Sequence, residues 1–487
     1  MEGPKSNGLE RPGKELHHES TGNACHCTKD KVWAYTKKRI PILAWLPNYK
    51  WKSDFDGDLF AGITLAFVNV PQAMAFAILA NAPLISGLYT ACFTALVYSF
   101  LGTARISSFG PIAVGSMFTG EAVAGYMTAK NMSVTPDGTD ADHQARVTYI
   151  ATLTFTIGLM YLSFFLLRIS AIRILFTKAF INGLISGLAV QVLLKTLKMV
   201  LGIKIPSHYG FFVVFKNVKD IADKIPDIHQ PTLIFSIIVF AILIFNMFVI
   251  KKFVAKFTTF IFPVEAITLL SSIAISYYYE FHNMGFETVG FIPKGLPELS
   301  PVDLSMIVQV IPDAVAISTI NYATALSMVI AFNPGVIDAN QETLAMATAN
   351  LLCSNIQCIT IGNAMIRTIL VMNVGIKTQL TTIISSIILF LVLMFAGPLF
   401  EPLPTAILGC IIILAIMQLL VGNLQAVPGI LKTSVEDGVI LATVFLVTTF
   451  LDMQMGLITG FILTLRQLLV RVISEDQKKD EAKQEVE

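Results

Sequence analysis

Two stretches of this 487-residue chain interrupt apolar segments with residues that break helices. Residues 107–117, SSFGPIAVGSM, place two hydroxyls, a glycine and a proline before a new apolar run, and residues 358–370, CITIGNAMIRTIL, place Gly362 and Asn363 before another. A helix that begins inside a protein directs its unpaired N–H groups and the positive end of its dipole inward. Two such N-termini, with Arg367 one turn into the second helix, are groups that can bind an anion.

The depth of the two interruptions follows from their distance to the nearest charged residues. Arg105 is expected at the inner interface of a membrane, and the extended chain from there covers about 20 Å to Pro111. Pro111 suits the first position of a helix, and Glu121 lies about 15 Å further along that helix, close to the outer surface. If Lys377 lies at the inner face, Arg367 is about 15 Å deeper. Both interruptions are therefore predicted near the midplane.

Each of these features has a structural alternative. The first interruption could be a proline-kinked helix, and Arg367 could form a structural ion pair with Glu265 or Asp313. These acids each follow a proline near the start of an apolar segment, so each suits either a helix cap or proton coupling. Paired interruptions favour a transporter site, and an arginine inside a membrane costs at least about 2.5 kcal/mol. We therefore interpret Arg367 as a substrate-binding cation and Asn363 as the N-cap of its helix.

The composition indicates which elements hold these residues. Hydrophobic residues make up 54% of the chain and charged residues 14%, against about 25% charged in soluble domains. The sequence therefore predicts an all-α polytopic membrane protein without a soluble domain, and its net charge of +1 suggests no nucleic-acid partner. Since a span needs about 20 residues, fourteen segments fit the charges: one carries Asp313, and the others are 59–80, 84–101, 111–127, 147–167, 174–201, 231–250, 258–279, 342–358, 364–373, 378–397, 404–421, 436–452 and 455–470.

Aromatic and basic residues indicate the orientation. All three tryptophans, Trp33, Trp45 and Trp51, lie among lysines and arginines in residues 31–57. This pattern predicts an interfacial pre-helix on the cytoplasmic side or, alternatively, a regulated lipid-binding segment. We assign the domains as a disordered tail at 1–30, this pre-helix, a transmembrane domain at 58–474 and a charged tail at 475–487, with both termini in the cytoplasm.

An outward-facing loop is predicted at 128–146. It is acidic, rich in turn residues, and carries at Asn131 the one N-x-S/T sequon of the chain with a permitted middle residue. Its position favours N-glycosylation.

Two polar motifs contain metal-ligand residue types without metal-ligand spacing. HHESTGNACHC in the N-terminal tail matches no closed zinc pattern, and DFDGD, with Asp54, Asp56 and Asp58, lacks the closing glutamate of a calcium loop. We predict neither a metal nor another cofactor, and we interpret DFDGD as the solvated start of the first helix.

Two longer stretches resemble one family. Residues 58–114 contain PQAMAFA, PLISGLY and GTARISSFGP, and residues 340–380 contain NQETLAMATANLL, GNAMIRTIL and KTQL. Both resemble the SulP anion transporters, the sulfate-permease-like exchangers and channels that include prestin, and the resemblance covers nearly all of 30–474. It implies seven plus seven inverted repeats, two half-helices that meet at the midplane, and a core domain that moves against a gate domain.

The resemblance also implies an anion site between the third and tenth helices. By position it would contain Gln72, Phe76, Pro111, Ile112, Ala113, Ala364, Met365, Ile366 and Arg367. Many relatives carry serine at the positions of Ala364 and Ile366, so two hydroxyl donors are missing here. A less polar site should favour monovalent anions over strongly hydrated divalent ones. Relatives usually continue into a cytoplasmic STAS domain, through which they partly dimerise, whereas this sequence stops at Glu487.

The expected function is secondary transport of small inorganic anions by elevator-like alternating access. Chloride and bicarbonate are the preferred substrates, with sulfate or oxalate as further ones, and Glu121, Glu265 and Asp313 are candidate coupling or structural acids. The expected setting is the plasma membrane, in contact with lipids and as a homodimer. The alternatives are a voltage-sensing motor or uncoupled anion channel, an organic-solute permease, against which Arg367 argues, and a transport-inactive paralogue. The sequence shows no nucleophile–base set that would favour an enzyme.

Overall fold

The computed structural model describes residues 29–133, 139–168, 177–205, 212–247, 264–290, 295–333, 337–395, 397–451 and 453–484. Within these ranges the chain is helical apart from loops and two short strands, which confirms the predicted all-α fold. The histidines and cysteines of the N-terminal tail and the basic stretch 251–256 lie outside the described residues.

The described residues of the first half of the chain contain the predicted interfacial region and seven membrane segments. The interfacial region consists of α1, Lys29–Arg39, α2, Ile42–Trp45, and a 3-10 turn at Leu46–Asn48. The segments are α3, Trp51–Leu79; α4, Leu84–Tyr89, joined by a π-helical turn, Thr90–Thr94, to α5, Ala95–Leu101; strand β1, Phe109–Gly110, with α6, Ala113–Ala129; α7, Asp140–Leu167; α8, Lys178–Leu201; α10, Gln230–Phe245; and α12, Val264–Tyr278. An amphipathic helix, α9, Val213–Asp223, lies between α8 and α10.

The second half also contains seven segments. They are α13, Ile307–Phe332; α14, Ala339–Cys353; strand β2, Gly362–Asn363, with α15, Met365–Val374; α16, Leu380–Phe395; α17, Thr405–Thr433; α18, Val435–Phe450; and α19, Met453–Gln484. Short 3-10 turns lie at Ile225–Asp227, Leu304–Met306, Ser354–Ile356 and Gly397–Phe400. In each half the third segment is a short strand followed by a helix, as two repeats of one plan require. The fourteen predicted segments are therefore confirmed.

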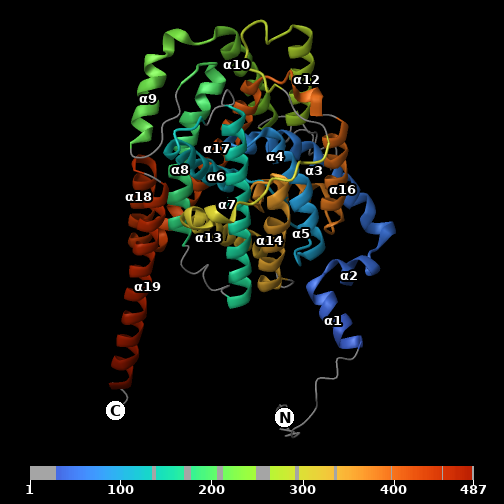
Figure 1. Ribbon diagram of the computed structural model, residues 1–487. Helices are drawn as coiled ribbons and strands as arrows, with labels where there is room; N and C mark the ends of the chain where they lie inside the picture. The colour runs from blue at the N-terminus through green and yellow to red at the C-terminus, as the bar shows by residue number, and fades with distance from the viewer. Residues whose placement is uncertain are drawn as a thin grey trace, which may run out of the picture.

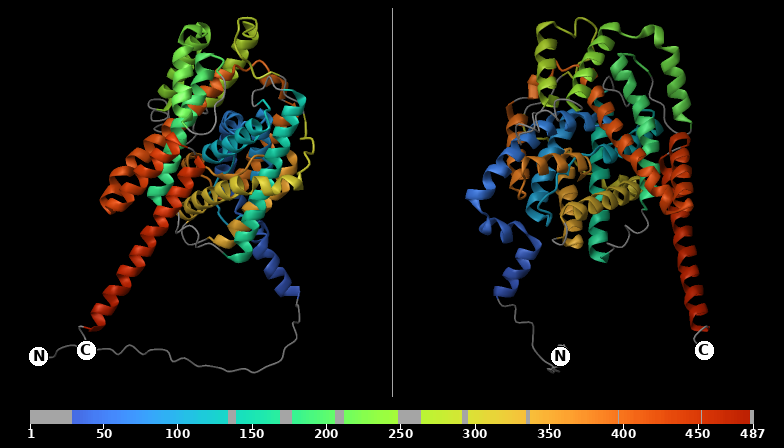
Figure 2. Two further views of the ribbon diagram at one scale, coloured as in Figure 1. Left: turned by 60° about the vertical axis from the view of Figure 1, so that its left-hand side comes forward. Right: turned by 180° about the vertical axis from the view of Figure 1, so that it is seen from behind.

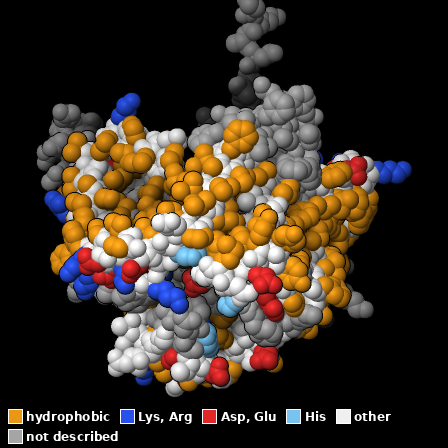
Figure 3. Space-filling model, turned by 90° about the horizontal axis from the view of Figure 1, so that it is seen from above, with side chains coloured by type: hydrophobic (Ala, Val, Ile, Leu, Met, Phe, Trp, Pro, Cys, Tyr) orange, Lys and Arg blue, Asp and Glu red, His pale blue; other side chains and the backbone are white. Residues whose placement is uncertain are grey.

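The outer surface of the helices is apolar, as a lipid environment requires. In the part of the chain that the structure describes, six helices are long and apolar enough to cross a membrane, and four shorter apolar helices accompany them. On α10, for example, Ile234, Ile237, Ile238 and Phe245 are all exposed. Figure 3 shows hydrophobic side chains over broad areas of the periphery, with charged side chains in small separate groups. Apolar surface on this scale is unusual for a soluble protein.

The segments form two bundles. The core bundle contains α3–α7 and α13–α16, and the gate bundle contains α8, α9, α10, α12 and α17–α19; most helix packing among the described residues occurs within each bundle. The main exception is α3, which packs on α16, α15 and α4 of the core bundle and also on α17 and α12 of the gate bundle; α6 makes a smaller contact with α8. In Figures 1 and 2, α8, α17, α18 and α19 lie side by side, and α1 and the end of α19 lie at the same end of the molecule.

The extended loop between α5 and β1 is held by hydrogen bonds from side chains to its backbone, because over most of its length it has no neighbouring strand to pair with in the described part of the chain. Glu342 accepts hydrogen bonds from the amides of Thr103 and Ala104, and Asn333 bonds both the amide and the carbonyl of Ile106. Gln379 donates to the carbonyls of Ala104 and Ser107 at 2.9 and 3.1 Å. Non-helical backbone at membrane depth requires such partners, and these contacts bring the loop to the position from which α6 begins.

The interpretation of DFDGD as a solvated helix start was wrong for Asp58. This carboxylate is fully buried and accepts hydrogen bonds from the amides of Lys377 and Thr378 at 2.7 and 3.0 Å, from the hydroxyl of Thr378 at 2.7 Å, and from that of Tyr49 at 3.0 Å. Burial and the neighbouring Asp58 raise the pKa of the Tyr49 phenol, which therefore remains a donor. Asp58 joins the start of α3 to the loop between α15 and α16.

Candidate anion-binding site

The two interruptions meet in space through their strands. β1 pairs antiparallel with β2, with Phe109 opposite Asn363 and Gly110 opposite Gly362, and the amide of Ala364 donates to the carbonyl of Ser108 at 3.0 Å. The strands satisfy buried backbone groups that neither half-helix can satisfy. The N-termini of α6 and α15 therefore begin from one shared two-stranded element, as the paired interruptions predicted.

The predicted starts of both half-helices were shifted. α6 begins at Ala113 with Ile112 as its N-cap, so Pro111 precedes the helix and contributes its carbonyl. α15 has Ala364 as its N-cap, whereas the Asn363 side chain accepts a hydrogen bond from Thr368 and donates to Ser107. Neither cap makes a side-chain hydrogen bond to its helix. Both helices thus lack a side-chain cap for their first N–H groups, which a bound anion can accept from.

Glycine permits the close approach of the two strands. Gly110 has a φ of +150°, and a Cβ there would lie 3.3 Å from Nη2 of Arg367. A Cβ at Gly362 would lie 2.3 Å from the Ile112 side chain. A larger residue at either position would separate the half-helices from each other or from the arginine.

Arg367 lies beside the paired strands and has no acidic partner among the described residues. Its side chain is 1% exposed; Nη1 donates to Oδ1 of Asn69 at 3.0 Å and Nη2 to the Pro111 carbonyl at 2.8 Å. Its Nε has no hydrogen-bond partner among the described residues. The arginine therefore connects α3, the start of α6 and α15 through neutral oxygens.

The alternative of a structural ion pair is not supported by the geometry. Glu265 accepts from Nε2 of Gln72 at 3.2 Å, and Asp313 accepts from Tyr149 and Gln454 at 2.9 and 2.7 Å. Within the described part of the chain, Arg367 forms no ion pair. Its positive charge therefore remains available to an anion at the two helix N-termini.

The other predicted site residues are mostly apolar. Ile112 and Phe76 are buried, Gln72, Ala113 and Ala364 are half-buried, and Met365 and Ile366 are each 48% exposed. The exposed face of α15 at its N-terminus thus presents two apolar side chains. The less polar site expected from the missing serines stays a prediction.

Sequence reasoning missed two asparagines of the site. Asn69 accepts from Arg367, and Asn321 on α13 is fully buried with neither amide atom bonded to a described group. Asn321 lies against the first turn of α6, because a Cβ at Gly115 would lie 2.8 Å from its Nδ2. Buried unpaired amides are rare. The available signal was a single asparagine within an apolar helix.

The three candidate acids all make contacts between the two bundles. Glu121 on α6 pairs with Lys195 on α8, Glu265 on α12 accepts from Gln72 on α3, and Asp313 on α13 accepts from Gln454 on α19. Asp313 lies inside α13, so its interpretation as a helix cap was wrong. The hydrogen bonds and ion pairs described for these acids go to other helices, and their role in coupling stays a prediction.

Asn131 is exposed immediately after α6, with a φ of +54° that asparagine tolerates better than most residues. Residues 134–138 of the predicted outward loop lie outside the described residues. Glycosylation of Asn131 stays a prediction.

Comparison with known proteins identifies the family. The model of the sulfate permease family matches residues 55–444. This chain belongs to the sulfate permease family. The resemblance found in the two signature stretches is thereby confirmed.

Members of the sulfate permease family resemble this chain over most of its length. Human solute carrier family 26 member 6 is 28% identical over 91% of this chain and 59% of its own length, and human prestin is 30% identical over 93% and 62%. The chain thus spans about three fifths of these relatives. The structure of murine solute carrier 26 family member A9, described as an anion transporter in the inward-facing state, superposes with a TM-score of 0.83 at 25% identity, covering 95% of this chain and 77% of that one.

Proposed function

We propose that this protein transports small anions across a membrane by moving its core bundle against its gate bundle, with a preference for monovalent anions such as chloride and bicarbonate. The observation that carries the proposal is Arg367, a buried guanidinium bonded to neutral oxygens beneath two uncapped helix N-termini. Membership of the sulfate permease family and the likeness to a structure described as an anion transporter support it.

The arginine acts on the anion mainly through its field. Two of its five N–H groups already bond Asn69 and Pro111, so the direct hydrogen bonds to the anion come from its remaining N–H groups and from the free N–H groups of α6 and α15. At an effective dielectric constant near 20, a charge at contact distance contributes about 4 kcal/mol. A neutral solute gains nothing from this field.

The apolar surface of the site sets the preference among anions. Entry requires an anion to lose hydration, and Met365, Ile366 and Ala364 offer no hydroxyl to replace it. This cost is greater for a divalent ion. Sulfate and oxalate should therefore be poorer substrates than chloride and bicarbonate.

The two bundles provide the moving parts. Helix packing is extensive within each bundle, and α3 carries the main apolar contact between them. The contacts of Glu121, Glu265 and Asp313 are polar, so each can be broken and remade at small cost once water enters. An elevator-like movement of the core bundle would carry Arg367 and both half-helices together.

The test is flux by the purified full chain in proteoliposomes with chloride, bicarbonate, sulfate and oxalate in turn. Arg367→Gln should lower apparent anion affinity at least about tenfold, since a contact charge is worth several kcal/mol. Arg367→Lys keeps the charge and loses the planar fork, so it should retain more chloride flux than oxalate flux. Lys216→Gln, an exposed residue on α9, is the control. A folded Arg367→Gln protein with unaltered anion dependence would contradict the proposal.

A voltage-sensing motor or uncoupled channel is the second candidate. A buried cation without a counter-ion, carried by a bundle that moves, would register as charge movement in the membrane field. Recordings of charge movement with and without a transported anion separate the two: a motor moves charge without net flux, and an exchanger needs a substrate on both sides.

A further inference from the structure

A second pocket lies at the end of the molecule that carries α1, away from the strands. It has a volume of about 150 Å³ and lies between the α2 region and the extended loop after α5. Its lining combines Pro41 and Trp45 of the α2 region with Thr103, Ala104 and Arg105 of the loop and Gln379 at the start of α16. None of these residues belongs to the candidate anion-binding site.

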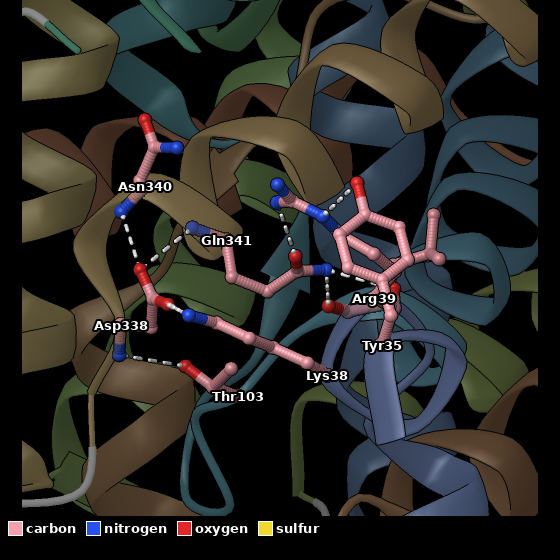
Figure 4. Close-up of polar contacts among 8 residues, drawn as sticks. Tyr35, Lys38, Arg39, Thr103, Asp338, Asn340 and Gln341 are labelled. Carbon is pink, nitrogen blue, oxygen red and sulfur yellow. Dashed lines mark hydrogen bonds and ion pairs between the residues drawn. The ribbon is translucent and has the colours of Figure 1, made fainter. Parts of the chain in front are cut away.

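The walls of this pocket are fixed to each other by a polar network (Figure 4). Nε2 of Gln341 donates to the carbonyls of Arg39 and Leu101, both at 2.9 Å, and so joins α1 to the loop. Nη1 of Arg39 donates back to Gln341 at 3.3 Å, and the amide of Asp338 donates to the hydroxyl of Thr103 at 3.4 Å. The pocket is therefore a built part of the fold.

Three cations of α1 near this pocket already have partners. Lys38 lies 3.8 Å from Asp338, Arg39 bonds Gln341 and Tyr35, and Lys37 lies over the Trp33 ring at 5.3 Å. Arg105 is exposed, and in the described part of the chain neither its guanidinium nor its amide N–H makes a hydrogen bond or ion pair. A free guanidinium beside a free backbone N–H is the donor set that recognises a phosphate group.

The position of the pocket points to the source of that phosphate. Trp33 and Trp51 are both exposed, and with Trp45 and the basic residues of α1 they mark the depth of lipid headgroups. We propose that the pocket binds the phosphate of an anionic phospholipid headgroup, with Arg105 as its cationic partner and Trp45 as its apolar wall. The bound lipid holds the loop that leads through β1 to α6.

The test follows the fluorescence of Trp45 in the full chain. Trp33→Phe and Trp51→Phe together leave Trp45 as the single tryptophan. Vesicles contain equal parts of phosphatidylcholine and phosphatidylglycerol, with bromine on only one of the two lipids in each sample. The anionic lipid should quench Trp45 with about a fivefold preference, the factor that corresponds to about 1 kcal/mol per basic residue at an anionic surface. In this background Arg105→Gln should abolish the preference, whereas Arg105→Lys and the distant Lys216→Gln should keep it. Equal quenching by both lipids in the parent, or an unchanged preference in Arg105→Gln, overturns the proposal.

Two further measurements complete the experiment. Melting curves of each variant exclude unfolding, which Arg105→Gln should not cause because Arg105 is exposed. Inorganic phosphate, added at constant ionic strength, distinguishes a lipid from a free ion. If millimolar phosphate leaves the preference intact, the lipid headgroup is the preferred ligand. If the parent shows no lipid preference while phosphate changes Trp45 fluorescence in a way that Arg105→Gln abolishes, the pocket binds free phosphate and the lipid assignment is wrong. The readout does not require transport, so it is independent of the proposed function.

Discussion

The guanidinium of Arg367 is stabilised by oxygen dipoles and lacks a formal counter-charge among the described residues. A cation in this setting is expensive inside a membrane, and its hydrogen bonds to Asn69 and Pro111 offset only part of that cost. An anion that arrives between α6 and α15 offsets more of it. The same residue therefore supplies both the attraction for the substrate and the reason that the empty site is less stable than the occupied one.

Asn69 allows this idea to be tested with little change in shape. Asn69→Asp places a carboxylate 3.0 Å from Nη1 of Arg367 and creates the counter-ion that the native site lacks. Anion flux should fall at least about tenfold, because the field of the arginine is neutralised, while the melting temperature should be maintained or rise. Flux per folded molecule and a melting curve are the measurements. Asn69→Ala, which removes the hydrogen bond and keeps the charge uncompensated, should retain more flux; the reverse order would contradict the electrostatic role.

Hydroxyl groups at positions 364 and 366 should change selectivity. Ala364 is the N-cap of α15 without a side-chain bond, and Ile366 is exposed, so both accept serine without steric conflict. The double substitution to serine supplies two donors for a divalent ion and should raise the sulfate-to-chloride flux ratio severalfold. Serine at the N-cap should also stabilise the helix by about 1 kcal/mol. An unchanged flux ratio in a protein with a higher melting temperature would show that the hydroxyls act on the helix alone.

Local sequence was sufficient to find some of these residues and insufficient for others. The interruptions and Arg367 stand out because glycine, proline and arginine are unusual in apolar runs. Asp58 and Asn69 gave no such signal, because their partners lie 319 and 298 residues away. A carboxylate that bonds distant backbone amides cannot be distinguished in sequence from one that faces water.

Among the elements, the two half-helices depend on a loop that has no regular structure. Residues 102–108 are held by Glu342, Asn333 and Gln379, which come from three different segments of the second half. The β1–β2 pair could not be predicted from the two-residue strands, which are too short to show alternation. What could be predicted was that the two interruptions lie at comparable depth in the membrane. Their pairing follows because buried backbone groups need partners.

The polar contacts between the bundles should control the rate of movement and leave selectivity unchanged. Gln454→Ala removes the gate-bundle partner of Asp313, at 2.7 Å, while Tyr149 still donates to that carboxylate. The turnover rate should change severalfold in either direction, depending on which conformation the contact stabilises, with the order of anion preference unchanged. Flux against concentration for two anions measures both quantities. Gln418→Ala, on α17 within the gate bundle, is the matched control. A changed anion order would place Gln454 in the site, contrary to this assignment.

At the scale of the whole molecule, composition and segment length determined most of the architecture. The number of segments and the all-α fold follow from the membrane, which requires internally bonded helices. The division into core and gate bundles did not follow from hydropathy, because lipid-facing and buried apolar residues look alike in sequence; it followed from the family resemblance. The helix α9 was not predicted, since its apolar stripe is too short for a span.

The orientation of the molecule supplies a final prediction. Arg39 lies 5.0 Å from the ring of Phe165, so the end of α7 is close to α1. α7 has 28 residues and spans about 42 Å, so Thr139 at its start, and Asn131 nearby, lie at the opposite face of the membrane.

If the basic α1 is cytoplasmic, Asn131 is outside and should carry a glycan. A glycosidase should increase gel mobility, and both Asn131→Gln and Ser133→Ala should abolish that shift. A tag after Gln484 should be accessible only in permeabilised cells, because the end of α19 lies at the same end of the molecule as α1 (Figure 2). A tag detected on intact cells, together with an absent glycan, would show that the topology is the inverse of the one predicted.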